Sequence, residues 1–325
     1  MSVYTQIHEA ELAPLLEAYG LGRVLALTPI QGGIENSNYF LTVEADGSAC
    51  ELVLTLFEEL APEEAAFLPA LLTHLHVEGV PVAAPLATRD GRYQPHFFGK
   101  AVQLAPRLHG GHPATPARAA CEAMGRALAG LHVALKGYPL ERHNAHGADW
   151  WNEVATRWRG RLELIDRLLL DKCLEDFARA CAQHPELPRG LIHGDLFRDN
   201  SLFVGDAVNG ILDFSEAAQD YLLLDIAITL NDFARAWPRL RLKQDSVRAF
   251  LQGYESLRPL SAAEKTLLPT FLAVAAMRFW LSRLDVAERN KAEGRQGEHI
   301  LEKDPKEMRD MLADRLSLGP GDLGL

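Results

Sequence analysis

Three side chains with oxygen donors lie in two loops of the chain, and apolar runs flank both loops. Asp195 and Asn200 are five positions apart in the first loop, and Asp213 lies in the second. Mg²⁺ prefers oxygen ligands and keeps several waters, so a few protein groups and substrate phosphates complete its shell. Phosphoryl-transfer enzymes use an Asp, an Asn five residues later and a separate metal-binding Asp. The spacing therefore predicts a phosphoryl-transfer site that binds Mg²⁺.

Each of these side chains suits one role. Asp195 is the predicted base, because a hydroxyl acceptor needs a carboxylate within hydrogen-bond reach. Asn200 and Asp213 are the predicted metal ligands. The alternative is that all three are ordinary turn residues, since Asp and Asn favour loops. His193 is a second candidate base, but we expect it to pack and hydrogen-bond to hold the loop, because Asp195 already fills the base position.

The first 106 residues are expected to form a small antiparallel sheet. Asp46-Gly47 predicts a tight hairpin. Gly32 and Gly33 suit a simple tight turn, or a loop whose backbone N–H groups approach a phosphate. The expected strands are 24–27, 39–43, 51–57 and 101–105, and the expected helices are 6–19 and 62–77.

Long helical patterns dominate the rest of the chain. The turn-rich segment 106–113 is the best linker, so we place one domain at 1–106 and a second at 107–325. Residues 288–310 are highly charged and are expected to form a solvated helix or a frayed segment. The expected helices of the second domain are 119–135, 149–170, 172–183, 219–236, 243–256 and 261–289.

Composition argues against several classes of protein. The net charge of −11 disfavours general nucleic-acid binding, which needs clustered Lys and Arg. The four cysteines form no CxxC pair, so a zinc or redox motif is unsupported. We find neither a signal peptide nor an apolar run long enough to span a membrane. A cytoplasmic protein is therefore expected, with no prediction of its oligomeric state.

The loop His193–Phe203 together with Leu212–Phe214 resembles the signature of the aminoglycoside phosphotransferase and choline kinase superfamily, which is protein-kinase-like. Further segments resemble its bacterial homoserine kinase branch. These segments are Gly32–Phe40, Val53–Glu58, Trp150-Trp151, Asp225–Asp232 and Arg278–Arg283.

The resemblance implies an α+β, bilobal protein-kinase-like fold, with a small antiparallel-sheet N-lobe and a larger, mainly helical C-lobe. It implies ATP and Mg²⁺ as cofactors and homoserine as the small-molecule acceptor, phosphorylated on its hydroxyl on the way to threonine. Asp195 is carried over as base, Asn200 and Asp213 as metal ligands, and Asp225 as an acid that braces the catalytic loop. The residues implied at the nucleotide are Gly32, Gly33, Ile34, Asn36, Ser37, Asn38 and Thr55, with Pro106, Arg107 and Leu108 as the hinge beside adenine.

Thr55 departs from the wider superfamily, in which this strand carries a phosphate-binding Lys. Thr cannot supply that charge, although the homoserine kinase branch shares the Thr. Lys100 is the nearest lysine in sequence on the same lobe, but we favour the interpretation that it is a surface residue of a hairpin and not a phosphate ligand.

The acceptor pocket is predicted less sharply. Homoserine needs at least one acid and one base besides Asp195. Asn231 and Asp232 could contact the ammonium, and Arg283 could bind the carboxylate. Asp232 could equally lie on a helix surface, and Arg283 in an internal salt bridge. Trp151 could line the pocket or pack in the core.

Homoserine kinase activity is the leading hypothesis. The alternatives are another small-molecule hydroxyl kinase, acting on choline, ethanolamine, an amino sugar or an aminoglycoside, and a nucleotide-binding pseudokinase, suggested by Thr55. A protein kinase fits poorly, because no Ala-Pro-Glu segment or activation-loop-length insert follows Asp213.

Overall fold

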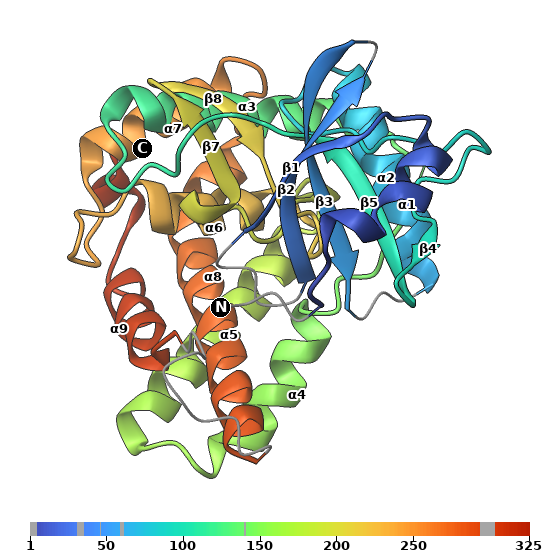
Figure 1. Ribbon diagram of the computed structural model, residues 1–325. Helices are drawn as coiled ribbons and strands as arrows, with labels where there is room; N and C mark the ends of the chain where they lie inside the picture. Colours follow the sequence, from blue (N-terminus) through green and yellow to red (C-terminus); the bar gives the residue numbers. More distant parts are fainter. Residues whose placement is uncertain (1–4, 31–35, 46, 59–61, 140, 293–302) are drawn as a thin grey trace. The chain divides into compact units, whose positions relative to one another are not determined.

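The computed structural model divides the chain into two compact units, Met1–His109 and Gly110–Leu325. The first unit ends three residues beyond the predicted boundary at residue 106. The fold is α+β and bilobal, as predicted (Figure 1). The structure describes residues 5–30, 36–45, 47–58, 62–139, 141–292 and 303–325.

The first unit is built on a five-stranded antiparallel sheet of order β1-β2-β3-β5-β4. Helix α1 and a short 3₁₀ helix cover residues that were expected to form one longer helix, and α2 has the predicted bounds. The elements are a 3₁₀ helix Glu9–Glu11, α1 Ala13–Tyr19, β1 Val24–Pro29, β2 Asn36–Ala45, β3 Ser48–Phe57, α2 Pro62–Val77, β4 His96–Phe97 and β5 Lys100–Pro106.

The two faces of this sheet differ because successive strand residues point to opposite sides. In β3, Leu52, Leu54 and Leu56 are buried in the apolar core, whereas Val53 and Thr55 on the other face are partly exposed. The β2–β3 register places Asn38 opposite Thr55. The predicted nucleotide residues Asn38 and Thr55 therefore share the face that does not pack on the core.

The second unit is mainly helical. Its longest helix, α8, has 31 residues and packs against α5, α6 and α9 (Figure 1). The helices are α3 Arg118–Ala134, α4 Ala148–Arg159, α5 Leu164–Gln183, α6 Leu222–Phe233, α7 Gln244–Glu255, α8 Ala262–Ala292, α9 Pro305–Arg315 and the 3₁₀ helix Pro320–Leu323.

Helix α8 is long and apolar enough to cross a membrane by length and composition. However, 72% of its apolar 18-residue window is buried inside the protein. Leu268, Phe271, Leu272 and Leu281 are all fully buried. The apolar character of α8 is therefore explained by its place in the core of the second unit.

Two short antiparallel ribbons interrupt the helices. One pairs β6 (Arg189–Ile192) with β9 (Ala218–Tyr221), and the other pairs β7 (Ser201–Val204) with β8 (Ala207–Ile211). The sequence interpretation began a helix at residue 219, which is wrong because Ala218–Tyr221 forms ladder bonds with β6. The break between α4 and α5 was also misplaced. It falls at residues 160–163, beginning at Gly160, a poor helix former.

Helices α3 and α7 pack closely through two glycines. A Cβ added to Gly125 would lie 2.0 Å from the carbonyl oxygen of Phe250, and one added to Gly253 would lie 2.0 Å from that of Glu122. These contacts are to backbone, which has no rotamer with which to move away. The close approach also fixes α3, which carries the buried His132.

We expect Gly125→Ala to destabilise the protein by about 3 kcal/mol, because overpacking must push the two helices apart. Urea unfolding measures the change. Gly130→Ala is the matched control on the same helix, since its Cβ would meet only the Leu257 side chain at 3.8 Å. The free energy of unfolding of Gly130→Ala should rise by about 0.5–1 kcal/mol, because alanine has a higher helix propensity than glycine. Equal destabilisation of the two variants would contradict the close-packing interpretation.

Candidate active site

The catalytic loop begins where β6 ends. Gly194 has φ +79°, and a Cβ at this position would lie 2.7 Å from the carbonyl oxygen of Glu216. Only glycine combines this left-handed backbone with so close an approach. The loop continues through a 3₁₀ turn, Arg198–Asn200, into β7. Glycine thus lets the chain turn sharply just before Asp195.

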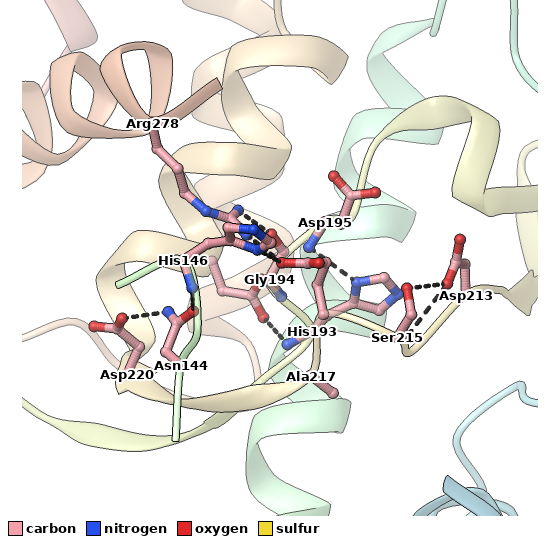
Figure 2. A network of polar contacts seen from close by, with 12 residues as sticks. Asn144, His146, His193, Gly194, Asp195, Asp213, Ser215, Ala217, Asp220 and Arg278 are labelled. Atoms are coloured by element: carbon pink, nitrogen blue, oxygen red, sulfur yellow. Dashed lines mark hydrogen bonds and ion pairs between the residues drawn. The ribbon is translucent and has the colours of Figure 1, made fainter. Parts of the chain in front are cut away.

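Asp195 lies partly buried beside Asn200. The Nδ2 group of Asn200 donates to the Asp195 carbonyl at 2.8 Å and to its carboxylate at 3.0 Å. Burial raises the pKa of Asp195 to about 8, against the opposing effect of the Arg278 guanidinium. In Figure 2 the Asp195 carboxylate points away from the His193 ring. Asn200 therefore holds Oδ2 of this carboxylate, while Oδ1 has no hydrogen bond within the described chain.

His193 supports this loop from inside. It is fully buried, its Nε2 donates to the Leu212 carbonyl at 2.8 Å, and its Nδ1 accepts from the Asp195 N–H at 3.2 Å. Burial lowers the pKa of His193, which favours the neutral ring that this donor–acceptor pattern requires. Both ring nitrogens are engaged, so the geometry gives His193 a positioning role rather than that of a base.

Asp213 and Asn200 leave oxygen atoms available for a cation. Asp213 has φ +57°, and its Oδ1 accepts from the backbone N and Oγ of Ser215 at 3.2 and 2.6 Å. The second Asp213 oxygen and the Asn200 Oδ1 have no hydrogen bond within the described chain. These hard oxygen donors suit Mg²⁺. No cluster of three or more His, Cys, Asp or Glu side chains suited to a metal occurs among the described residues, so a cation held by Asp213 and Asn200 would take its other ligands from water or phosphate.

Two carboxylates on α6 hold the catalytic loop. Asp225, fully buried, accepts from the backbone N–H groups of His193 and Gly194 at 2.8 and 2.9 Å. Asp232 accepts from the backbone N and Nε of Arg198 at 2.8 and 2.9 Å. Residues seven apart lie on one face of a helix. One face of α6 therefore fixes both ends of the loop that carries Asp195.

A chain of buried polar groups extends from Asp225. His132 lies 3.0 Å from Asp225 through Nε2 and 2.7 Å from the Tyr254 hydroxyl through Nδ1. Arg258 donates to that hydroxyl and pairs with Glu264 at 2.8 Å. Although burial alone would raise the pKa of Asp225, the hydrogen bond and charge of His132 hold it below the ordinary value. The brace is thus anchored on α3, α7 and α8.

Arg278 on α8 reaches the same loop. Its side chain is only 3% exposed; one Nη donates to the Gly194 carbonyl and the other to Glu216 Oε2 at 2.8 Å. Figure 2 shows Arg278 entering the network beside His146 and Gly194. The sequence interpretation quoted Arg278 in a family segment but gave it no role. The sequence feature that could have identified Arg278 is an arginine within an otherwise apolar helical run.

The four predicted acceptor residues are engaged within the protein. Trp151 is 1% exposed, and its Nε1 donates to the His146 carbonyl. Asn231 donates to the Leu272 carbonyl and accepts from Arg315 Nε at 2.7 Å, while Asp232 binds Arg198. Arg283 pairs with Glu307 at 2.9 Å. These contacts join α6 to α8 and α9, and α8 to α9, so the geometry favours the packing and salt-bridge alternatives, and a substrate role for the four residues stays a prediction.

The predicted nucleotide residues lie in the first unit. Gly32, Gly33 and Ile34 lie outside the described residues. Asn36 accepts from the Glu58 backbone N–H at 3.3 Å, and Asn38 accepts from the Thr55 hydroxyl at 2.8 Å. Ser37 is fully buried on the core face, where it donates to Glu58 at 2.6 Å. Within β2, Asn38 and not Ser37 shares a face with Thr55.

Lys100 and the predicted hinge also have defined contacts. Lys100 pairs with Glu58 at 2.7 Å, on the side of Ser37, so its charge lies on the opposite face from Thr55. Arg107 pairs with Glu51 at 3.0 Å and stacks over Phe40 at 4.0 Å. Pro106 ends β5 opposite Leu52, and Leu108 follows with partial exposure.

A phosphotransferase enzyme family model matches residues 26–260, which is more than half of the chain. A homoserine kinase from Neisseria meningitidis serogroup B is 40% identical over 319 residues, covering 98% of this chain and 100% of its own. A homoserine kinase from Pseudomonas aeruginosa is 39% identical over 315 residues, covering 97% and 96%.

The chain belongs to the homoserine kinase family of phosphotransferases. Solved structures confirm the fold. An aminopropanol kinase associated with a microcompartment has a TM-score of 0.64 at 18% identity, covering 96% of this chain and 94% of its own. An amicoumacin kinase in complex with AMP-PNP, Ca²⁺ and Ami has a TM-score of 0.62 at 17% identity, covering 94% and 91%. The predicted resemblance is therefore confirmed, and the protein is a phosphotransferase with a small-molecule substrate.

We expect Asp225→Asn to destabilise the protein by about 3 kcal/mol in urea unfolding. The amide offers one acceptor oxygen in place of two, and its NH₂ would face a buried donor. Asp171→Asn is the control, because Asp171 makes a half-exposed pair with Arg159 and should change stability by under about 1 kcal/mol. Similar losses in both variants would show that Asp225 has no special role as a brace.

Proposed function

We propose that the protein catalyses ATP-dependent phosphorylation of the hydroxyl of L-homoserine, giving O-phospho-L-homoserine. The observation that carries the proposal is the 40% identity to a homoserine kinase over nearly the whole length of both chains. The grouping of Asp195, Asn200 and Asp213 around one loop and hairpin of the second unit supports the same chemistry. We propose in addition that the protein is cytoplasmic and takes part in threonine biosynthesis.

Asp195 acts on the acceptor in this proposal. Its carboxylate, held by Asn200 through Oδ2, accepts a hydrogen bond from the acceptor hydroxyl and directs the hydroxyl oxygen toward the γ-phosphorus. It receives the hydroxyl proton as the phosphoryl group moves. Burial and the nearby Asp213 and Glu216 charges favour proton uptake, and Arg278 opposes it. His193 keeps Asp195 in place through the hydrogen bond from its backbone N–H.

Asn200 and Asp213 hold Mg²⁺ through their free oxygens in this proposal. When bound, the ion neutralises charge on the β- and γ-phosphates. The first unit binds ATP through the segment Gly32–Asn38, through Thr55 on the exposed sheet face, and through the hinge Pro106–Leu108. Asn38 and Thr55 are already linked by a hydrogen bond, so they present one polar pair on that face.

A coupled ADP-release assay with homoserine, choline, ethanolamine, an amino sugar and an aminoglycoside tests the acceptor. We expect turnover with homoserine to exceed that with the others. Asp195→Asn should lower kcat by about 10²–10⁴-fold with little change in ATP affinity, because the amide cannot take the proton. Turnover of another alcohol and not homoserine would overturn the acceptor assignment. Nucleotide binding with no transfer to any alcohol would identify a pseudokinase.

Chelation tests the metal assignment. We expect EDTA to abolish turnover and Mg²⁺ to restore it. Asp213→Asn should raise the Mg²⁺ concentration needed for half-maximal activity by at least about tenfold, since it removes a charged ligand. Ser215→Ala is the control, because it removes a hydrogen bond to Asp213 but keeps both carboxylate oxygens. An unchanged Mg²⁺ requirement in Asp213→Asn would exclude Asp213 as a ligand.

A further inference from the structure

Glu216 lies directly beside the catalytic loop, and the proposed function gives its carboxylate no contact with either substrate. Its backbone oxygen and Cβ are the atoms nearest to a Cβ built on Gly194, at 2.7 and 3.4 Å. Its charge is also among those that raise the pKa of Asp195. Glu216 is thus a neighbour of the base in space, although 20 residues separate them in sequence.

The Glu216 carboxylate is held on one oxygen and open on the other. Oε2 accepts from His146 Nδ1 at 2.6 Å and from Arg278 at 2.8 Å. Oε1 has no hydrogen bond within the described chain, and the side chain is 29% exposed. Although burial would raise the pKa of Glu216, the His146 hydrogen bond and the Arg278 charge hold it below the ordinary value. The open oxygen therefore belongs to an ionised carboxylate at neutral pH.

The partners of Glu216 are themselves fixed. Arg278 is 3% exposed and also donates to the Gly194 carbonyl. The backbone N–H of His146 donates to Asn144 at 2.9 Å, and its carbonyl accepts from Trp151. A carboxylate oriented by such partners needs little reorganisation to bind a ligand.

An open carboxylate oxygen and a nearby aromatic ring favour a cationic ligand. Arg278 and His146 share Oε2 of Glu216, and Arg142 donates to the neighbouring carbonyls of Ser215 and Ala217, so Oε1 is the oxygen left for a ligand. Trp150 is partly exposed, and its ring meets that of His146 edge-on, with centroids 4.9 Å apart. Aromatic rings beside a carboxylate suit an ammonium group through cation–π attraction.

We propose that Glu216 binds the ammonium group of the acceptor through Oε1, with Trp150 beside it. This inference rests on the proposed function and deepens it: the site selects amino alcohols whose hydroxyl then lies at Asp195. Arg278 and His146 are positioning residues that orient Glu216. The assignment also replaces Asp232, whose carboxylate binds Arg198, as the acid of the acceptor site.

The test compares homoserine with 4-hydroxybutyrate, which lacks only the amino group. We expect wild-type kcat/KM to be at least about tenfold higher for homoserine, because 4-hydroxybutyrate cannot form the charge-assisted hydrogen bond between the ammonium group and Glu216. Glu216→Gln should lower kcat/KM for homoserine by about 10–100-fold, mainly through KM. Because Glu216 also binds Arg278 and its charge acts on Asp195, turnover of 4-hydroxybutyrate should fall too, but at least about fivefold less than that of homoserine. The KM for ATP should stay within about twofold, and Glu216→Asp should restore part of the preference. Glu186→Gln is the control, because it neutralises an exposed carboxylate that pairs with His184 and should leave turnover of both acceptors unchanged.

Equal loss with both acceptors in Glu216→Gln would overturn the inference and leave Glu216 a purely structural partner of Arg278. Equal use of the two acceptors by the wild-type protein would overturn it without any variant. If homoserine does not react but another amino alcohol does, the proposed function fails, while the same comparison with that acceptor and its deaminated analogue still decides the role of Glu216. If no alcohol reacts, both proposals fall.

Discussion

The fully buried carboxylate of Asp225 is the constraint on which the site depends. A carboxylate without water needs donors on its oxygens, and Asp225 finds them in two successive backbone N–H groups of the catalytic loop and in His132. Satisfying these acceptors fixes the path of the loop at Gly194. Because α3 supplies His132 and α6 supplies Asp225, the packing of these two helices determines the position of Asp195, the proposed base.

Asp232, two turns later on α6, is a second carboxylate that accepts hydrogen bonds from the loop, at its far end. It is bound by Arg198, whose guanidinium stacks 3.7 Å over Trp237. Between the two anchors, Asp195 is partly buried near like charges, which raises its pKa and disfavours its ionised form. Arg278 is the opposing influence from α8. The fold thus combines a rigid loop with a raised pKa at Asp195, which makes its carboxylate a stronger proton acceptor but leaves less of it ionised at neutral pH.

Local patterns allowed Asp195, Asn200 and Asp213 to be predicted, because one loop and one hairpin bring them together. The same is true of α2, because Pro62 and the two acidic residues after it are typical of a helix start. Arg278 and Glu216 could not be paired in this way, since helical spacing shows which face is buried but not which loop it meets. For the same reason Asn231 and Arg283 looked available, whereas Arg315 and Glu307 of α9 occupy them.

Strand alternation determines which positive charges lie on the Thr55 face of the first unit's sheet. Strand alternation puts Lys100 with Ser37 and Glu58 on the core side of the sheet, so its ammonium cannot replace a lysine at Thr55. Arg107 stacks on Phe40, which has the same strand parity as Asn38, so its guanidinium lies over the Thr55 face. A positive charge is therefore present on that face, but it is delivered from the end of β5 and is partly offset by Glu51. Thr55 contributes a hydroxyl bound to Asn38 rather than a charge.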